Sequence, residues 1–314
     1  MNKLIISPIY FKEVTVMLQL HTDHYFHIGS AHLTSGKPCQ DYAVSGVQDN
    51  VALAIVSDGC STGRHTDVGS RILTLSTATA IREHWLTKRN ACDKTVPQEI
   101  SLCQNIVLFG IKQTLGLNTN DMLATCLYAY VSPIGGFIHI QGDGVIALKY
   151  RDGNILMSRF EWQNNTPYYP AYHSEDLENF IKDHGDDLNA NCLIRENCTQ
   201  ETDSNFSESN VEEYTLRQGI QGININLSSD LLFNDVEFIA IFSDGITQID
   251  KTDWKDAVSK FMAFKNTTGE FVKRRIIRGI KDVQKFGKGP IDDVSCAIIR
   301  VEQINKEEDQ DAKD

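Results

Sequence analysis

The clearest hydrophobic pattern is a run of six apolar side chains at 51–56, followed directly by Ser-Asp-Gly at 57–59. Such a run predicts a buried strand that delivers a carboxylate at its end, and the glycine lets the backbone turn sharply there. The pattern recurs at 237–245, where a second apolar run ends in Asp244 and Gly245. Two strands of this kind indicate two carboxylates positioned in the same way.

The remaining apolar positions predict strands and helices in blocks. Period-two and continuous apolar runs predict strands at 14–20, 25–30, 42–47, 51–58, 122–131, 136–141, 145–150, 154–160, 237–243 and 294–301. Apolar residues three and four apart predict helices at 66–88, 98–115, 252–264 and 269–286, and a shorter one at 175–182. Strands, then helices, then strands, helices and a strand are typical of an α+β layered sandwich.

Two segments lack such patterns. Residues 161–235 are polar, so we interpret them as an elaboration on a single domain of 1–304, with a mobile loop at 197–210. Residues 305–314 are charged and almost without apolar side chains, and we expect a disordered acidic tail there.

Charge and cysteine usage narrow the function classes. The net charge is −12 and the pI is near 5.2, which argues against nucleic acid or an anionic membrane as the main partner. The apolar runs are too short to cross a bilayer, and the first twenty residues lack the order of an export signal. Eight scattered cysteines without a CxxC pair favour a reducing compartment. We expect a cytoplasmic monomer.

Acidic residues lie at the boundaries between apolar runs and turns, at Asp41, Asp58, Asp244, Asp292 and Asp293. One Asp-Gly at a strand end is usually only a turn. Several strand ends can, however, converge on one edge of a sandwich, where carboxylates bind Mg²⁺ or Mn²⁺ through oxygen. Two such ions would lower the pKa of a shared water and hold an anionic substrate.

Six segments resemble, in order and spacing, those of the metal-dependent type 2C serine/threonine protein phosphatases (the PPM family), and GSAHLTSGKPCQD is similar to its divergent bacterial branch. These segments are CQD (39–41), IVSDGCSTG (55–63), MLATCLYAYV (122–131), IQGDGVIAL (140–148), IFSDGIT (241–247) and DDVSCAIIRV (292–301). The resemblance implies a four-layer α-β-β-α sandwich with two central antiparallel sheets flanked by helices. It also implies a binuclear Mg²⁺ or Mn²⁺ site at one end and a variable flap at 161–235.

The resemblance further implies the metal ligands. Asp58 would bridge both ions, and the carbonyl of Gly59 would bind one of them. Asp244 and Asp292 would bind the other ion.

Further acidic positions follow from the same resemblance. Asp293 stands where the family often has asparagine, and Asp41 matches the acidic residue of its Glu-Asp or Gln-Asp pair, acting directly or through water. Asp121 is the candidate ligand for a third ion, and we interpret Asp143 as structural.

The phosphate-binding residue departs from the family pattern. Many members place an arginine shortly before the acidic pair, where this chain has Gly36 and Lys37. Lys37 or His32 could donate to a phosphate oxygen, and His32 could also act as a general acid. A packed, structural histidine is an equal alternative for His32. Gln40 replaces the glutamate of many members, which removes one negative charge.

These features predict an enzyme: a signalling phosphatase that hydrolyses phosphoserine and phosphothreonine in proteins, with Asp58, His32 and Lys37 as catalytic residues. A metal-activated water would attack phosphorus without a phosphoenzyme. A pseudophosphatase that only binds phosphoproteins is one alternative, favoured by the missing arginine and by Gln40. A metal-dependent hydrolase of small phosphate esters is another.

Overall fold

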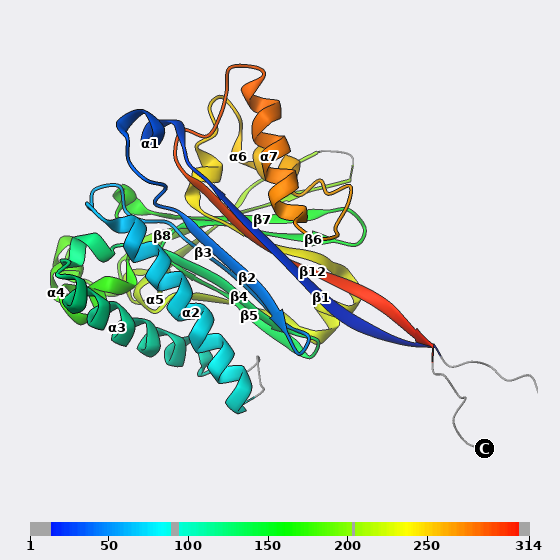
Figure 1. Ribbon diagram of the computed structural model, residues 1–314, viewed down its shortest axis with the longest axis horizontal. Coiled ribbons are helices and arrows are strands. Elements are labelled where there is room, and N and C mark those ends of the chain that lie inside the picture. The colour runs from blue at the N-terminus through cyan, green and yellow to red at the C-terminus, as the bar shows by residue number, and fades with distance from the viewer. Residues whose placement is uncertain (1–13, 89–93, 203–204, 308–314) are drawn as a thin grey trace, which may run out of the picture.

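Two antiparallel sheets form the centre of the protein, as a computed structural model that describes residues 14–88, 94–202 and 205–307 shows (Figure 1). The larger sheet comprises, in spatial order, β1 (Val14–His27), β12 (Val294–Glu307), β11 (Val236–Phe242), β6 (Gly144–Tyr150), β7 (Ile155–Trp162), β8 (Asn191–Gln200) and β9 (Asn210–Thr215). The smaller sheet comprises β10 (Ile223–Ser228), β5 (Gly135–Gln141), β4 (Cys126–Ser132), β3 (Val51–Ser57) and β2 (Tyr42–Gln48).

Helices cover the outer face of each sheet. The longer ones, α2 (Thr66–Lys88) and α3 (Val96–Leu115), pack on the smaller sheet, and α6 (Trp254–Phe261) and α7 (Phe271–Gln284) pack on the larger. A third apolar core fills the space between the sheets. The four-layer α-β-β-α sandwich expected from the sequence is therefore confirmed.

Short helices and turns complete the chain. They are α1 (Ser30–Ser35), η1 (Thr119–Met122), η2 (Gln163–Asn165), η3 (Pro170–Ser174), α4 (Leu177–Asp183), α5 (Leu216–Gln221), η4 (Leu231–Asp235) and η5 (Asp244–Thr247).

Strand β3 shows why its apolar run is continuous. Ala52, Ala54 and Val56 face the core between the sheets, whereas Val51 and Ile55 face the helices α2 and α3. Since side chains alternate along a strand, a strand covered on both faces needs apolar residues at every position. Each buried Val or Ile side chain contributes about 1.5–3 kcal/mol to folding.

Several boundaries differ from the expectations. The segments 14–20 and 25–30 were expected as separate strands, but one strand, β1, runs from Val14 to His27 and pairs with β12 along its whole length. The expected strand at 122–131 begins only at Cys126, because η1 ends at Met122 and the residues between them form only an isolated bridge, Gly59 with Ala124. Helix α1 was not expected.

The polar segment 161–235 contributes edge strands to both sheets, and its interpretation as an elaboration on a single domain stays a prediction. It supplies β8 and β9 at the edge of the larger sheet and β10 at the edge of the smaller. The expected loop at 197–210 is a strand up to Gln200. These edge strands are polar because cross-strand ion pairs replace apolar contacts on their outer face, as between Arg195 and Glu212 at 3.5 Å.

The C-terminal strand β12 continues to Glu307, so it includes the first three residues of the expected tail. Residues 308–314 lie outside the described ranges. Of the helices that the structure describes, none has both the length and the hydropathy required to cross a membrane.

Candidate active site

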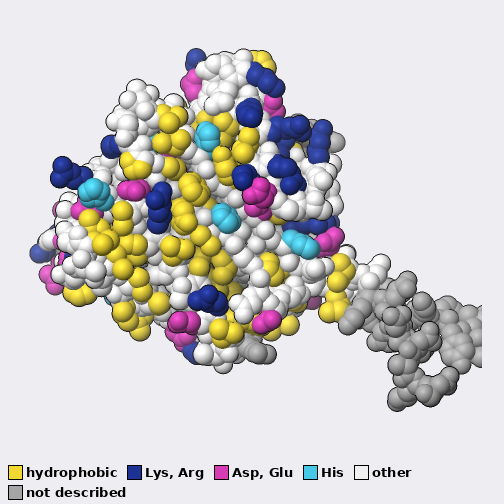
Figure 2. All heavy atoms as spheres, viewed as in Figure 1, with side chains coloured by type: hydrophobic (Ala, Val, Ile, Leu, Met, Phe, Trp, Pro, Cys, Tyr) yellow, Lys and Arg dark blue, Asp and Glu magenta, His cyan; other side chains and the backbone are white. Residues whose placement is uncertain are grey.

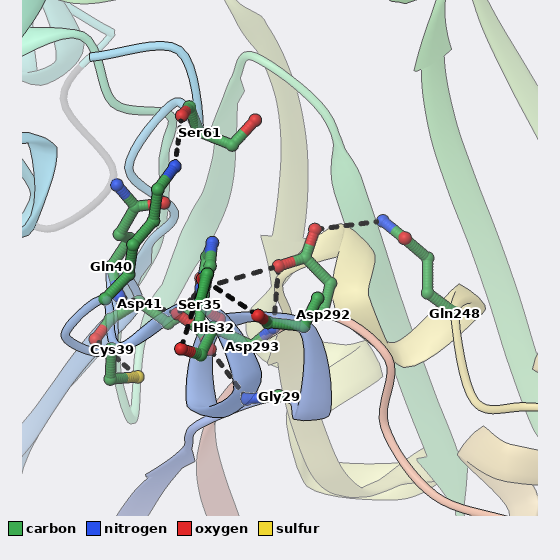
Figure 3. A network of polar contacts seen from close by, with 12 residues as sticks. Gly29, His32, Ser35, Cys39, Gln40, Asp41, Ser61, Gln248, Asp292 and Asp293 are labelled. Atoms are coloured by element: carbon green, nitrogen blue, oxygen red, sulfur yellow. Dashed lines mark hydrogen bonds and ion pairs between the residues drawn. The ribbon is translucent and has the colours of Figure 1, made fainter. Parts of the chain in front are cut away.

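The predicted carboxylates gather at one end of the sandwich. Antiparallel pairing places the end of one strand beside the start of the next, so Asp58, which follows β3, lies near Asp41, which precedes β2. In the same way, Asp244 follows β11 and lies near Asp292, which precedes β12. Figure 3 shows this region around Asp41 and Asp292.

Asp41 is almost completely buried, with 1% of its surface exposed. Its Oδ2 accepts a hydrogen bond of 2.6 Å from the Ser243 hydroxyl, whereas its Oδ1 is buried without a hydrogen-bond partner among the described residues. Burial raises the pKa of Asp41 to about 7, and the charges of Asp293 and Asp244 add to the rise. An unsatisfied, buried carboxylate oxygen is the kind of atom that a metal ion satisfies.

Asp58 lies at the centre of the charges. Burial raises the pKa of Asp58 well above its usual value, and the charges of Asp41, Asp244 and Asp143 raise it further. Burial also raises the pKa of Asp244, with Asp292 adding to it, and burial raises the pKa of Asp143, with Asp244 adding to it. We call Asp41, Asp58, Asp143, Asp244 and Asp292 the carboxylate cluster.

The strongest charges that act on the cluster are negative. Burial is the largest cause of the raised pKa of Asp41, Asp58, Asp143 and Asp244, and the main charge contributions to these shifts come from neighbouring carboxylates. Several ionised carboxylates cannot share a poorly solvated site without a compensating cation. A set of oxygen donors with that deficit fits Mg²⁺ or Mn²⁺, so the residues present suit the metal that the sequence predicts.

Gly59 is required by close packing. A Cβ atom there would lie 2.6 Å from the carbonyl oxygen of Thr66 and 3.0 Å from that of Gln40. The Gly59 N–H donates to the Gln40 carbonyl at 3.2 Å. These contacts hold the turn after β3 against the Gln40–Asp41 segment, while metal binding by the Gly59 carbonyl stays a prediction.

Asp293 lies in a network of hydrogen bonds, and metal binding by its carboxylate stays a prediction. It is buried, and both of its oxygens already accept hydrogen bonds from the protein (Figure 3). Its Oδ1 accepts from the Gly29 N–H at 2.7 Å, and its Oδ2 accepts from the Gln40 N–H at 2.6 Å and from His32 Nδ1 at 2.9 Å. Asp293 therefore ties three parts of the N-terminal segment to the start of β12.

His32 is buried in α1 and belongs to this network. Its Nδ1 lies 3.9 Å from Asp292 Oδ1, and the ligand atoms of His32, Asp292 and Asp293 all lie within 4.8 Å of one another. Because the Asp293 carboxylate accepts at Nδ1, that nitrogen carries the proton. His32 therefore lies beside Asp292 and is held in place by Asp293, while its catalytic role stays a prediction.

Lys37 lies on the surface beside the site. Its ammonium group donates to the Ser61 carbonyl at 2.9 Å, in the loop that follows Gly59. The structure therefore does not bring Lys37 into the carboxylate cluster but holds it against a neighbouring loop.

Asp121, the candidate ligand for a third ion, forms a capping box with Asn118. The Asp121 N–H donates to Asn118 Oδ1 at 3.2 Å, and the Asn118 N–H donates to Asp121 Oδ2 at 3.1 Å. This contact is that of a helix cap. Metal binding by Asp121 stays a prediction, and Asp143 is the carboxylate on which the charge of Asp244 acts.

Asp143 and Gln248 are the residues that the sequence reasoning undervalued or missed. Asp143 sits in the turn where the chain crosses from β5 in the smaller sheet to β6 in the larger, between Gly142 and Gly144, both at positive φ. Gln248 Nε2 donates to Asp244 Oδ2 at 3.2 Å and to Asp292 Oδ2 at 3.4 Å, which joins two carboxylates. A Gly-Asp-Gly turn between two apolar strands was the available signal for Asp143.

Comparison with known proteins agrees with this geometry. The family described as protein phosphatase 2C matches residues 28–277. No curated protein sequence gives a match.

Solved structures share the fold. A bacterial serine phosphatase is 12% identical, with a TM-score of 0.52, and the alignment covers 90% of this chain and 98% of that one. The serine/threonine phosphatase Stp1 from Staphylococcus aureus is also 12% identical, with a TM-score of 0.51, and the alignment covers 95% of this chain and 100% of that one. Since the family match spans most of the sequence, the chain belongs to the protein phosphatase 2C family, the metal-dependent serine/threonine protein phosphatases.

Proposed function

We propose that the protein hydrolyses phosphoserine and phosphothreonine in proteins with two divalent cations, Mg²⁺ or Mn²⁺, bound by the carboxylate cluster. The observation that carries the proposal is the gathering of Asp41, Asp58, Asp244 and Asp292 at one end of the sandwich, where burial and neighbouring carboxylates raise the pKa of the first three. Two dications would compensate the negative charge of these side chains. When bound, they supply a water of lowered pKa and neutralise charge on the phosphate.

The charge interactions among the carboxylates suggest which residues would bind which ion. Asp58, on which the charges of Asp41, Asp244 and Asp143 all act, would hold both ions. The Gly59 carbonyl would hold one ion, and Asp244 and Asp292, held together by Gln248, would hold the other. A third ion would be held by Asp143 with Asp244.

The chain's own proton donor is His32. Asp293 fixes the orientation of the ring through its contact with Nδ1. Figure 3 shows the other ring nitrogen directed away from Asp293. From that nitrogen His32 donates a proton to the serine or threonine oxygen as it leaves phosphorus, and Lys37 contributes positive charge at the rim of the site.

We also propose that the enzyme works as a cytoplasmic monomer on signalling phosphoproteins. The seven cysteines in the described ranges are all free thiols, which suits a reducing compartment.

The test is hydrolysis of p-nitrophenyl phosphate and of a phosphothreonine peptide, with Mn²⁺, with Mg²⁺ and with EDTA. Asp58→Asn should abolish the metal-dependent turnover, whereas Asp250→Asn, whose carboxylate is 38% exposed near Lys251, should not. Isothermal titration with Mn²⁺ measures metal binding separately.

The alternatives give different results in the same experiment. Metal and phosphopeptide binding without turnover would identify a pseudophosphatase. Faster turnover of nucleotides or sugar phosphates than of phosphopeptides would identify a hydrolase of small phosphate esters.

A further inference from the structure

A groove beside α7 is strongly basic although the protein is acidic. Residues 263–288 contain eight lysines and arginines and two acidic residues, a net charge of +6, so the other residues carry −12 − 6 = −18. The groove has a volume of about 590 Å³ and lies between α7 and the segment 263–266. We call it the basic groove; its cations are Lys265, Arg274, Arg275, Arg278, Lys281 and Lys285. Figure 2 shows lysine and arginine side chains gathering at the upper right, where Figure 1 places α7.

Four of these cations form one stripe along the helix. Arg274, Arg278, Lys281 and Lys285 are spaced by four, three and four residues, which places them on the same face. Like charges at these spacings repel each other and destabilise the helix. The stripe is therefore unfavourable for the isolated protein and needs another explanation.

The stripe is only partly compensated by the protein itself. Lys285 pairs with Asp282 at 2.8 Å, and the Arg274 guanidinium donates to the Thr268 carbonyl at 2.6 Å. Arg278 and Lys281 are exposed and have no ion pair with a carboxylate in the described ranges. Two adjacent cations are thus left for a partner.

The floor of the groove is apolar. Phe264, Phe271 and Ile277 contribute to its lining, and the two phenylalanine rings pack edge to face with centroids 5.3 Å apart. A hollow with cationic walls and an apolar floor fits a polypeptide that alternates acidic and apolar side chains. A bilayer surface does not enter a hollow of this size, and the charge of −18 elsewhere repels a long nucleic acid.

A second hollow lies beside the C-terminal end of α7. Lys285 lines the basic groove, and its chain neighbour Gln284 lines this second hollow of about 330 Å³, together with Pro290 and Ile291. The next residue along the chain is Asp292. The C-terminal end of the basic groove is therefore followed along the chain by residues that precede the carboxylate cluster.

We propose that the basic groove binds an acidic stretch of the phosphoprotein substrate, in the same polypeptide as the phosphorylated residue. This inference rests on the proposed phosphatase function for the identity of the partner, although binding itself requires no catalysis.

Binding is measured by fluorescence anisotropy with a labelled, unphosphorylated octaglutamate peptide. The double variant Arg278→Glu/Lys281→Glu should bind it at least about tenfold more weakly, because two attractions become repulsions. The matched control, Arg82→Glu/Arg217→Glu, makes the same charge change on exposed residues of α2 and α5 and should bind within about twofold of wild type.

Catalysis is measured on the same proteins. Turnover of p-nitrophenyl phosphate should be equal in all three, whereas kcat/KM for a phosphothreonine peptide with an acidic stretch should fall about tenfold or more only in the α7 variant. Equal loss of peptide binding in both double variants would overturn the proposal. So would tighter binding of an oligonucleotide or of phosphatidylserine vesicles than of the peptide.

The phosphatase function and the role of the basic groove can be refuted independently of each other. A wild-type protein without turnover that still binds octaglutamate through Arg278 and Lys281 refutes the phosphatase function and retains the groove. An active wild type whose peptide binding is unchanged by the α7 variant refutes the groove and retains the phosphatase.

Discussion

Replacing Asp293 by asparagine tests the junction between the N-terminal segment and β12. The carboxylate has two acceptor oxygens that serve three donors: Gly29 N–H, Gln40 N–H and His32 Nδ1. Asparagine keeps one acceptor oxygen and places an NH₂ group where the other oxygen stood. At least one buried donor then loses its acceptor.

The expected cost follows from these contacts. A buried donor without a partner costs about 1–3 kcal/mol, and the remaining hydrogen bonds lose the strengthening that a charged acceptor provides. Because Asp293 is only 2% exposed, water cannot replace the lost acceptor. We therefore expect Asp293→Asn to lower the free energy of unfolding by about 2–4 kcal/mol, or Tm by about 4–8 °C.

Urea unfolding and thermal melting by circular dichroism measure the change, with Asp250→Asn as the control. Its side chain is 38% exposed and its Oδ2 lies 3.9 Å from Lys251 Nζ, so its removal should cost less than about 0.5 kcal/mol. Phosphatase activity should also fall in Asp293→Asn, because His32 and the Gln40–Asp41 segment lose their common anchor. A variant that melts with wild type and keeps full activity would refute this role for Asp293.

Three further predictions concern the same end of the sandwich. Burial raises the folded-state pKa of Asp41 from 3.8 to about 7, so without metal the contribution of Asp41 to stability is fully present below about pH 4 and is lost as the pH rises toward 7. The increase in Tm on adding Mn²⁺ should therefore grow from about pH 5 to pH 7. An increase in Tm that is constant with pH would contradict this. Gly245→Ala places a Cβ atom 1.7 Å from the Asp293 carbonyl oxygen and should destabilise the fold by more than about 3 kcal/mol, seen as loss of soluble protein. The control Gly46→Ala, whose Cβ atom meets nothing within 4 Å, should leave the protein soluble. Asp121→Ala should lower the free energy of unfolding by about 1 kcal/mol through the lost cap and leave kcat unchanged. Asp143→Asn should instead lower metal-dependent activity. The reverse pattern, measured by thermal melting and turnover, would indicate that Asp121 binds the third ion.

The pattern of apolar residues along the chain was sufficient to predict much of the fold. The continuous apolar run of β3 and the spacing of Val272, Ile276, Ile280 and Val283 on α7 each report burial directly, because the covered faces repeat with the period of the element. The strand ends that carry Asp58 and Asp244 follow from the same patterns.

Other features depend on contacts between distant residues. Asp121 and Asp143 both lie next to apolar strands in the sequence, so the sequence pattern does not distinguish them. The crossing from β5 to β6 places Asp143 beside Asp244. Polar β8 and β9 form strands because ion pairs between neighbouring strands, such as Arg195 with Glu212, replace apolar burial. The role of Asp293 could not be predicted either, since its donors lie more than 250 residues earlier in the chain.

The position of β12 also determines when the enzyme can first work. Gln40 and Asp293 are 253 positions apart, and ribosomes add about 5–20 residues per second. Roughly 10–50 s therefore pass between synthesis of the Gln40–Asp41 segment and synthesis of Asp293, which binds it. During that time neither Asp292 nor Asp293 is present, and the nascent chain lacks part of the carboxylate cluster. On the proposed mechanism, dephosphorylation therefore requires residue 293 to have left the ribosome.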